Sequence, residues 1–316
     1  MNAPRTRVQR RPVHGVLLLD KPYGLSSNDA LQKAKWLLRA EKAGHTGTLD
    51  PLATGVLPLC FGAATKFSQL HLDADKSYEA IAVLGIQTST GDLEGDVVLE
   101  KPVDFTSEQL RAVQAQFTGP ISQVPPMYSA LKKDGKALYD YARAGIEVER
   151  DARQVTIQAL KLEEIEPENG RRRLKIEVTC SKGTYIRTLG EDIAIALGTC
   201  AHLSALRRTV TGPFVASQCI TVAELEALTE QAREARLLPV DALLDGHTPV
   251  TLPPEDAGRF LSGVRRRGPW PDSAHMAVYG QTPHTLLGTA HVTAGELIPG
   301  RLLSPIEIQS ILECQA

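Results

Sequence analysis

The chain has 316 residues, of which 42% are hydrophobic and 23% charged, and its formal net charge is −2. This length can bury an ordinary core and suits one large domain plus one small domain. No apolar run approaches the ~20 residues that a membrane helix needs, and the first residues are too hydrophilic for a signal peptide. We therefore expect a cytoplasmic protein without a membrane span.

The cysteines and the charges narrow the function only slightly. Five cysteines stand apart without a CxxC pair, and their odd number leaves one outside any disulfide set. This indicates isolated buried thiols rather than a zinc site. The first 50 residues carry nine Lys or Arg against four Asp or Glu. One basic face is sufficient for binding phosphates, although each basic cluster can equally be an ordinary solvated surface.

The first elements of the chain are a tail, a strand and a helix. Residues 1–13 are basic and lack apolar periodicity, which predicts a loose tail. Gly15–Leu19 is an apolar run typical of a buried strand that ends in a turn. Apolar residues at helical spacing then predict a helix through Leu38, with Ser27 or Asn28 as its N-cap.

A glycine-rich loop, Gly44–Gly55, connects this helix to an apolar strand at Val56–Phe61. A further strand is predicted at Tyr78–Leu84. The Thr106–Gln109 segment has the pattern of a capping box, which predicts a helix that continues to Phe117.

The clearest strand pattern lies at Leu174–Cys180, where apolar residues occupy every second position. The helix that follows has its apolar face within Ile186–Leu197, and Gly198 is its predicted C-terminal stop. A second capping box at Thr221–Glu224 predicts a helix to about Arg236.

The Pro-rich stretch Pro249–Pro254 predicts a domain boundary. Beyond it, helical periodicity fades, and we predict short β segments at Ala277–Tyr279, Leu286–Val292 and Arg301–Leu303. Before it, strands and helices alternate irregularly. This alternation predicts an α/β or α+β domain with a mixed sheet.

One carboxylate, Asp50, stands in the glycine-rich loop, and Pro51 fixes the backbone after it. An acid on a constrained loop between two strands is a plausible catalyst, but from the residues alone a turn-capping Asp is the simpler interpretation. The sequence has no GxGxxG, GxxxxGK[ST] or GxSxG motif, which leaves dinucleotide, P-loop and hydrolase sites without support. His45 and Asp50 could form half of a metal site, but no third ligand has useful spacing.

Several motifs occur in order over residues 14–214, and together they resemble those of the TruB family of tRNA pseudouridine-55 synthases. The signature loop of that family is similar to Gly44–Leu57. The other matching segments are Leu19–Asn28, Lys76–Tyr78, Val124–Lys132, Tyr139–Gly145, Cys180–Arg187 and Leu206–Arg208. The chain departs from the family at Thr88-Ser-Thr90, where the middle residue is commonly Asp, and we expect this departure to be peripheral.

The resemblance implies an enzyme that isomerises uridine 55 in the TΨC loop of tRNA to pseudouridine. This reaction breaks the N1–C1′ bond, turns the uracil and joins C5 to C1′, so no cofactor and no metal are expected. The implied fold is a catalytic domain with a mixed, largely antiparallel sheet flanked by helices, followed by a small β-rich, PUA-like RNA-binding domain. The expected limits are 1–13 for the tail, 14–248 for the catalytic domain and 249–316 for the PUA-like domain.

The resemblance also assigns the residues of the active site. Asp50 is the essential carboxylate, which either adds covalently or abstracts a sugar proton. Tyr78 stacks on the uracil and can take the C5 proton, and Arg187 pairs with Asp50. Tyr185 and Leu206 line the pocket. Without the motifs, the same side chains would be taken for core or surface residues.

Four further residues are expected to contact RNA. The target uridine must be flipped out of its loop, and His45 fills or braces the space that it leaves. Lys21, Lys66 and Lys132 contact phosphates or brace the loops that face the RNA. A purely structural role is the alternative for each of them.

An insertion at about residues 125–153 is rich in Tyr, Lys and Arg and is expected to be mobile until it closes over the TΨC loop. A rigid hairpin is the alternative.

The expected partner is tRNA alone, bound by a monomer without a guide RNA or an obligatory protein partner. The rival functions are a non-catalytic tRNA-binding protein, a uridine methyltransferase and an RNA-guided synthase. The presence of Asp50, Tyr78 and Arg187 argues against the first of these, the lack of a methyl-donor pocket against the second, and the lack of long basic extensions against the third.

Overall fold

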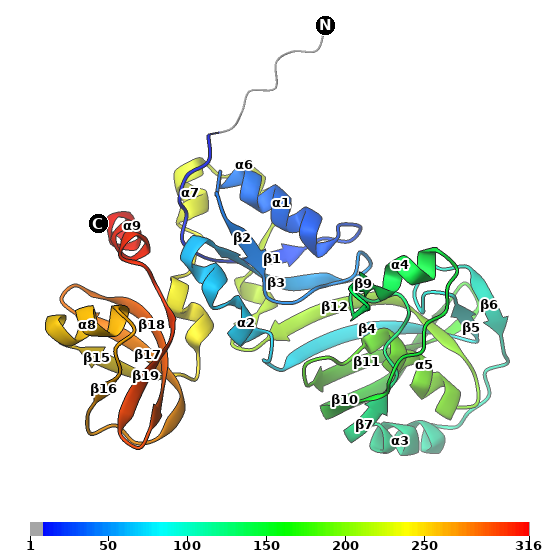
Figure 1. Ribbon diagram of the computed structural model, residues 1–316. Helices are drawn as coiled ribbons and strands as arrows, with labels where there is room; N and C mark the ends of the chain where they lie inside the picture. Colours follow the sequence, from blue (N-terminus) through cyan, green and yellow to red (C-terminus); the bar gives the residue numbers. More distant parts are fainter. Residues whose placement is uncertain (1–8, 316) are drawn as a thin grey trace, which may run out of the picture.

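The computed structural model describes residues 9–315 and consists of a large mixed sheet with helices and a smaller β-rich part (Figure 1). In the large sheet the strands follow the order β14-β1-β3-β12-β4-β11-β10-β7, with β2 and β13 beside β3 and β12. The strand bounds are β1 Gly15–Lys21, β2 Ala43–His45, β3 Thr54–Phe61, β4 Lys76–Leu84, β7 Gly119–Gln123, β10 Arg153–Glu168, β11 Arg171–Cys180, β12 Ala201–Thr211, β13 Phe214–Val215 and β14 Ile220–Thr221. Most neighbouring pairs are antiparallel, and β1–β14 and β3–β12 are parallel, which confirms the predicted mixed sheet.

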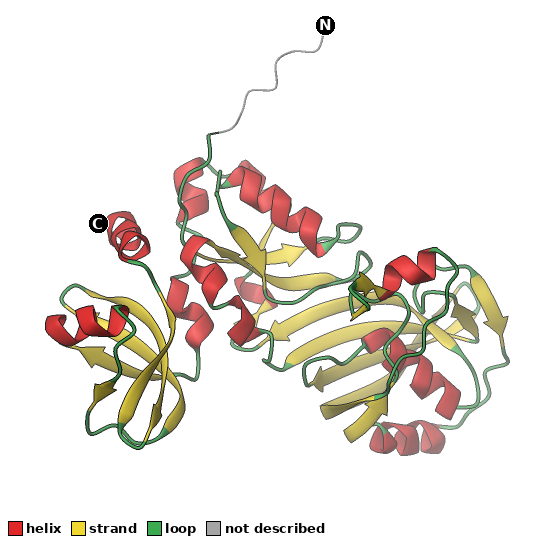
Figure 2. Ribbon diagram, viewed as in Figure 1, coloured by secondary structure: helices red, strands yellow, loops and turns green. Residues whose placement is uncertain are grey.

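Helices lie on both faces of this sheet. In Figure 2, viewed as in Figure 1, α3 and α5 lie against one face, and η1 and η3 pack on β1 and β3 from the other. The helix bounds are α1 Ser27–Leu37, η1 Gly62–Lys66, α2 Ser68–His71, α3 Ser107–Gln116, α4 Leu138–Arg143, α5 Ile186–Ala196, η2 Ala216–Gln218, α6 Val222–Ala227, α7 Glu230–Glu234 and η3 Val240–Leu244. The apolar side chains of β4, β11 and β12 pack with α1 and α5 in one core. Over β4 and β11 the opposite face carries outward residues such as Ser77, Glu79 and Glu177, so it is polar there.

The β-rich part forms a separate five-stranded sheet in the order β15-β17-β18-β19-β16. Its elements are β15 Thr248–Leu252, α8 Pro254–Leu261, β16 Arg266–Arg267, β17 Ser273–Gln281, β18 His284–Thr293, β19 Glu296–Leu302 and α9 Pro305–Gln315. Its apolar side chains Ala277 and Leu286 belong to the same buried cluster as Val16 and Phe67 of the larger part. The two parts therefore share a core, and helices α8 and α9 were not predicted.

Two short hairpins extend from the large sheet. β5 Ile86–Thr88 pairs with β6 Val97–Glu100, and β8 Lys132–Lys133 pairs with β9 Lys136–Ala137 in front of α4. The second hairpin and α4 lie within the predicted insertion.

Strand β12 contains two β-bulges where it pairs with β4. The register shifts once between Leu203 and Ala205 and again between Arg208 and Val210. Between these bulges, Leu206 and Arg208 are buried whereas Arg207 lies on the polar face, where both nitrogens of its guanidinium donate to Asp20 at 2.9 and 2.7 Å. The bulges therefore decide which side chains of β12 enter the core.

The predicted tail at residues 1–13 is wrong for its second part, and residues 1–8 lie outside the described residues. The Arg11 backbone pairs with that of Arg39 and Glu41, its side chain forms ion pairs with Glu230 and Glu234, and Val13 is buried. A segment that is held by backbone hydrogen bonds need not show a periodic apolar pattern in its sequence. The absence of that pattern in residues 9–13 was therefore wrongly interpreted as a loose tail.

Two predicted helix boundaries also need correction. The N-cap of α1 is Ser26, whose hydroxyl accepts from the Asp29 amide at 3.1 Å, rather than Ser27 or Asn28. The capping box at Thr221 is present, but α6 ends at Ala227, and Thr229 then caps α7. A single helix to Arg236 is therefore wrong.

Gly55 is a position where a side chain cannot fit. Its φ is +100°, and a Cβ there would lie 2.1 Å from the Arg208 carbonyl oxygen. We predict that Gly55→Ala lowers the free energy of unfolding by at least about 2 kcal/mol, because left-handed strain and overpacking add. Gly198→Ala is the matched control, since its φ is +81° but no atom lies within 4 Å. Urea denaturation should give about 1 kcal/mol for the control, and equal losses in the two variants would contradict the steric argument.

Candidate active site

A row of paired residues crosses four strands of the large sheet. Lys21 of β1 pairs with Gly55 of β3, Gly55 pairs with Arg208 of β12, and Arg208 pairs with Tyr78 of β4. Directly paired residues project to the same face of a sheet. The row thus gathers three polar side chains, and Gly55 lets β3 and β12 approach closely, because a Cβ there would meet the Arg208 carbonyl oxygen.

The loop that carries Asp50 is held from both sides. The Leu49 amide donates to the Ser27 hydroxyl at 2.7 Å, and this hydroxyl donates to the Leu49 carbonyl at 3.0 Å. The Pro51 carbonyl accepts from the Gly24 amide at 2.9 Å. These contacts restrain the residues on both sides of Asp50 and fix where its carboxylate points.

Arg187 forms the predicted pair with Asp50, with 2.9 Å between Nη2 and Oδ2. It lies in the first turn of α5, and its side chain is 4% exposed, whereas that of Asp50 is 37% exposed. Nη1 donates to the Thr90 carbonyl and Nη2 to the Tyr128 carbonyl, both at 2.7 Å. A buried guanidinium with three partners has one orientation, so the Asp50 carboxylate meets a fixed charge.

Asp92 is a second carboxylate beside Arg187, and sequence reasoning missed it. It is 4% exposed, and its Oδ2 lies 3.7 Å from Nη1. The Thr90 hydroxyl and the Glu94 amide donate to its Oδ1. Ser89, where the chain departs from the family pattern, is exposed, but Thr90 contacts Arg187. The departure at Ser89 therefore lies at the surface, whereas its neighbour Thr90 belongs to the surroundings of Arg187.

Tyr78 is half-buried in β4, opposite Arg208. Burial raises the pKa of the Tyr78 hydroxyl, and the Arg208 guanidinium beside it opposes this rise. Arg208 is 1% exposed and donates from Nε to the Val56 carbonyl at 2.7 Å. A phenol next to a cation loses its proton more readily than a buried phenol alone.

Tyr185 and Leu206 lie near the same centre. Tyr185 precedes α5, and its amide donates to Gln123 Oε1 at 3.1 Å. Burial raises the pKa of Tyr185, and the negative charge of Asp50 acts in the same direction. Leu206 is 7% exposed and pairs with Ala80, two residues along β4 from Tyr78. Both residues therefore stand close to the Asp50–Arg187–Tyr78 group.

His45 and Lys21 border the glycine-rich loop. Burial lowers the pKa of His45, and Arg208 acts in the same direction; its Nδ1 has no partner within the described part of the chain. Lys21 is fully buried, donates to the Leu25 carbonyl at 2.6 Å, and burial lowers its pKa to about 8. Lys21 thus braces the turn after β1, and its expected part in RNA binding stays a prediction.

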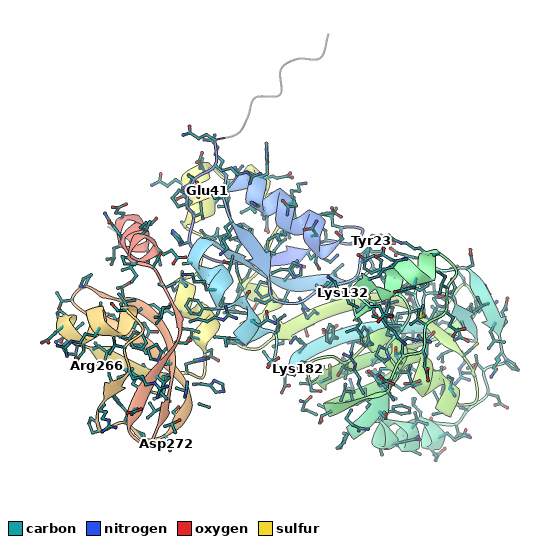
Figure 3. The ribbon with its side chains drawn as sticks, in the orientation of Figure 1. Tyr23, Glu41, Lys132, Lys182, Arg266 and Asp272 are labelled. Atoms are coloured by element: carbon teal, nitrogen blue, oxygen red, sulfur yellow. The ribbon has the colours of Figure 1, made fainter. Side chains whose placement is uncertain are left out.

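The other two lysines lie apart from this centre. Lys66 forms an ion pair with Glu307 of α9 at 2.6 Å and donates to the Leu302 carbonyl at 2.9 Å. It therefore connects the two parts of the chain, and its expected part in RNA binding stays a prediction. Lys132, labelled in Figure 3, is an exposed residue of β8.

Sequence reasoning missed Ser27, Asp92 and Arg208 as parts of this arrangement. Ser27 was interpreted as a helix cap, and Asp92 lies in a segment without a recognised motif. Arg208 stood in a matched motif, but no signal separated it from Arg207. Among the described residues, no three His, Cys, Asp or Glu side chains gather where they could share a metal ion. None of the described helices has both the length and the apolarity for a membrane crossing.

Comparison with known proteins gives consistent matches over nearly the whole chain. The model of the TruB family pseudouridylate synthase N-terminal domain matches residues 35–186, and that of the tRNA pseudouridylate synthase B C-terminal domain matches residues 187–245. The chain is 64% identical to tRNA pseudouridine synthase B of Verminephrobacter eiseniae, covering 99% of this chain and 96% of that protein. The corresponding protein of Chromobacterium violaceum is 54% identical, with 96% and 98% covered.

Solved structures support the fold. The chain is similar to one in a crystal structure of a Cbf5–Nop10–Gar1 complex, with a TM-score of 0.69, 25% identity, and 96% and 90% of the two chains covered. A chain in the structure of an H/ACA RNP bound to a substrate RNA containing 2′-deoxyuridine gives a TM-score of 0.67 at 23% identity, covering 96% and 88%. The mixed sheet and the C-terminal β-rich domain therefore form a known architecture.

The buried contacts of Arg187 predict that a lysine cannot replace it. Arg187→Lys keeps a positive charge but cannot reach Asp50, the Thr90 carbonyl and the Tyr128 carbonyl together. We expect the free energy of unfolding to fall by about 1–3 kcal/mol, the cost of leaving buried acceptors unpaired. Arg111→Lys, at an exposed pair with Glu108, should change it by less than about 1 kcal/mol. Urea denaturation of both variants checks this, and equal stabilities would refute it.

Proposed function

This chain belongs to the TruB family of pseudouridylate synthases, and from that premise we propose that it isomerises uridine 55 in the TΨC loop of tRNA to pseudouridine. The observation that carries the proposal is the Asp50–Arg187 pair, a partly exposed carboxylate held by a buried guanidinium. Such a carboxylate is oriented and kept available to attack or deprotonate a sugar. A non-catalytic RNA-binding protein would not need that arrangement.

The proposed reaction begins when the target uridine leaves its stack and enters the site. Flipping a base out of a folded loop costs a few kcal/mol, roughly the free energy of unstacking. His45, in β2 next to the Asp50 loop, is suited to fill the space that the base leaves. Leu206 and Tyr185 would enclose the uracil and keep it from diffusing away once it is detached.

Asp50 then promotes cleavage of the N1–C1′ bond, either by adding to the sugar or by removing a sugar proton. The uracil turns so that C5 faces C1′, and a C5–C1′ bond forms. Tyr78 takes the proton from C5, which restores the planar ring. Because the product is an isomer of the substrate, the overall balance requires no oxidant, reductant or group donor.

We further propose that the enzyme acts in the cytoplasm as a monomer on tRNA alone. The related chains of known structure are described in complexes with Nop10 and Gar1, whereas tRNA pseudouridine synthase B is the name of the 64% identical relative. We propose that residues 14–248 form the catalytic domain and that the β-rich part from about residue 249 is a PUA-like domain that binds RNA. The basic side chains of this domain include Arg266, labelled in Figure 3, which forms an ion pair with Asp256.

The insertion at about 125–153 is proposed to close over the bound loop. Its own contacts hold it together: Lys133 donates to the Glu149 carbonyl at 2.7 Å and Arg150 to the Pro125 carbonyl at 3.1 Å. Lys136 lies over the ring of Tyr141 at 4.6 Å. Few apolar side chains anchor this segment, and its cations would be neutralised by phosphates.

Replacing Asp50 tests the proposed function directly. Asp50→Asn should abolish pseudouridine formation while tRNA affinity stays within a few-fold, because phosphate contacts supply most of the affinity. Mapping of pseudouridine in an unmodified tRNA transcript, with no cofactor added, measures turnover, and filter binding on the same preparation measures affinity. Near-normal turnover by this variant would remove Asp50 from the mechanism.

The hydroxyl of Tyr78 is expected to matter for chemistry rather than for binding. Tyr78→Phe retains the ring that stacks on uracil but loses the group that accepts the C5 proton. We expect the single-turnover rate to fall by at least ~10²-fold, the lower range for a general acid–base group, with tRNA affinity retained. A variant that reacts as fast as the wild type would show that the hydroxyl has no role in proton transfer.

Closure of the insertion can be followed by hydrogen exchange. Amides within 125–153 should exchange quickly in the free protein and become protected at saturating tRNA, because binding would order the segment. Amides of β11 serve as the internal control, since they lie in the centre of the sheet and should be protected in both states. Strong protection of 125–153 without tRNA, unchanged by its addition, would instead establish a rigid hairpin.

A further inference from the structure

Among the described residues, Arg208 is a buried cation that forms no ion pair with a carboxylate. It is 1% exposed, and its Nε donates a hydrogen bond to the Val56 carbonyl. Its Nη2 is buried and has no partner among those residues. An unpaired charge costs several kcal/mol to bury, and adjacent Arg207 shows that β12 can direct an arginine to solvent and to an acid. The position of Arg208 therefore calls for a functional explanation.

The guanidinium of Arg208 lies between Tyr78 and the glycine-rich loop. Arg208 and Tyr78 are paired residues of β12 and β4, and they project to the same face. A Cβ at Gly47 would lie 3.7 Å from Arg208 Nη1, so the other side of the guanidinium faces the loop that carries Asp50. Arg208 thus lies between Tyr78 and the glycine-rich loop of the proposed site.

The surroundings of Arg208 are short of negative charge. Burial, together with the charge of Arg208, lowers the pKa of Lys76 to about 8, and burial with the charges of Lys76 and Arg208 lowers that of His71 to about 4. Arg208 also lowers the pKa of Lys21 and His45. A buried group of basic residues favours a negative charge that forms among them.

We propose that Arg208 is a positioning residue that holds the Tyr78 oxygen and stabilises the phenolate that accepts the proton of uracil C5. This inference rests on the proposed function. In the step concerned, C5 has already joined C1′, and the C5–H bond breaks. Its electron pair forms the C5–C6 double bond, the electrons of the C6–N1 double bond move to N1, and N1 takes a proton from solvent water. The proton from C5 forms an O–H bond with the phenolate. The Tyr78 phenol had earlier released its own proton to solvent water, and Arg208 stays protonated throughout.

The proposal gives a direction for the dependence of the rate on pH. The charged or titratable groups that face Tyr78 are Arg208 of β12, Cys180 of β11 and Asp50 of the loop, with Lys76 on β4 itself. Burial raises the pKa of Tyr78, Cys180 and Asp50 act in the same direction, and Arg208 lowers it. Removing Arg208 should therefore raise this pKa and move the increase of rate with pH to higher pH.

The test compares the variants R208Q and R208K with R207Q in single-turnover assays at saturating tRNA. R208Q should be at least about tenfold slower than the wild type below the pKa of Tyr78, the ratio that corresponds to one pKa unit, and R208K should lie between. R207Q, which loses the pair with Asp20 on the polar face, should remain close to the wild type. An equal loss in R207Q and R208Q would assign both effects to the sheet and overturn the proposal.

A fluorinated tyrosine at position 78 distinguishes an effect of Arg208 on the Tyr78 hydroxyl from an effect of Arg208 on folding. Its phenol is more acidic, so it should restore part of the rate of R208Q and return the pH profile towards that of the wild type. If R208Q does not fold, the same replacement is made in R208K. No recovery in the folded variant, or R208Q reacting like the wild type, overturns the role of Arg208. Neither result affects the proposed function. The proposed function is refuted if the wild type forms no pseudouridine at position 55.

Discussion

The arrangement of the site depends on one buried charge, the guanidinium of Arg187. Four segments that are far apart in the sequence meet at it: the Asp50 loop, the turn at Thr90, the insertion at Tyr128 and the first turn of α5. A charge at this depth has to be matched by acceptors, so the segments cannot separate without leaving it unpaired. The same contacts that stabilise the fold thus place the carboxylate, and the free energy of folding prepares the site before any substrate binds.

Around Arg187, the sheet holds side chains at fixed spacings that loops alone would not maintain. The row through Lys21, Gly55, Arg208 and Tyr78 fixes spacings by backbone pairing, and Gly55 allows the close approach of β3 to the Arg208 backbone. The proposed carboxylate lies on a loop, but that loop is held at Leu49 and Pro51. Chemistry on a loop is compatible with precision when a rigid scaffold restrains its flanks.

The sequence allowed prediction of those features that depend on near neighbours. The alternating strand at Leu174–Cys180 and the capping box at Thr106–Gln109 are local patterns, and both are confirmed. Partners distant in sequence were not accessible in this way. Lys66 and Glu307 are 241 residues apart, and nothing in either neighbourhood indicates their pair. The Asp50–Arg187 pair was expected only through resemblance to a family, because spacing alone does not report a contact between a loop and a helix.

The two bulges of β12 decide whether Arg207 or Arg208 faces the core, so the outcome depends on the number of residues in this strand. In an unbroken strand, side chains alternate strictly, so a continuation of the phase of Ala201 and Leu203 would bring Arg207 inwards and send Arg208 to solvent. The extra residue at each bulge reverses that phase and then restores it before Thr211. Deleting Ala205 while the bulge at Ser204 is kept would leave the composition almost unchanged and yet exchange the two arginines. Insertions and deletions in this strand should therefore be far less tolerated than substitutions on its outer face.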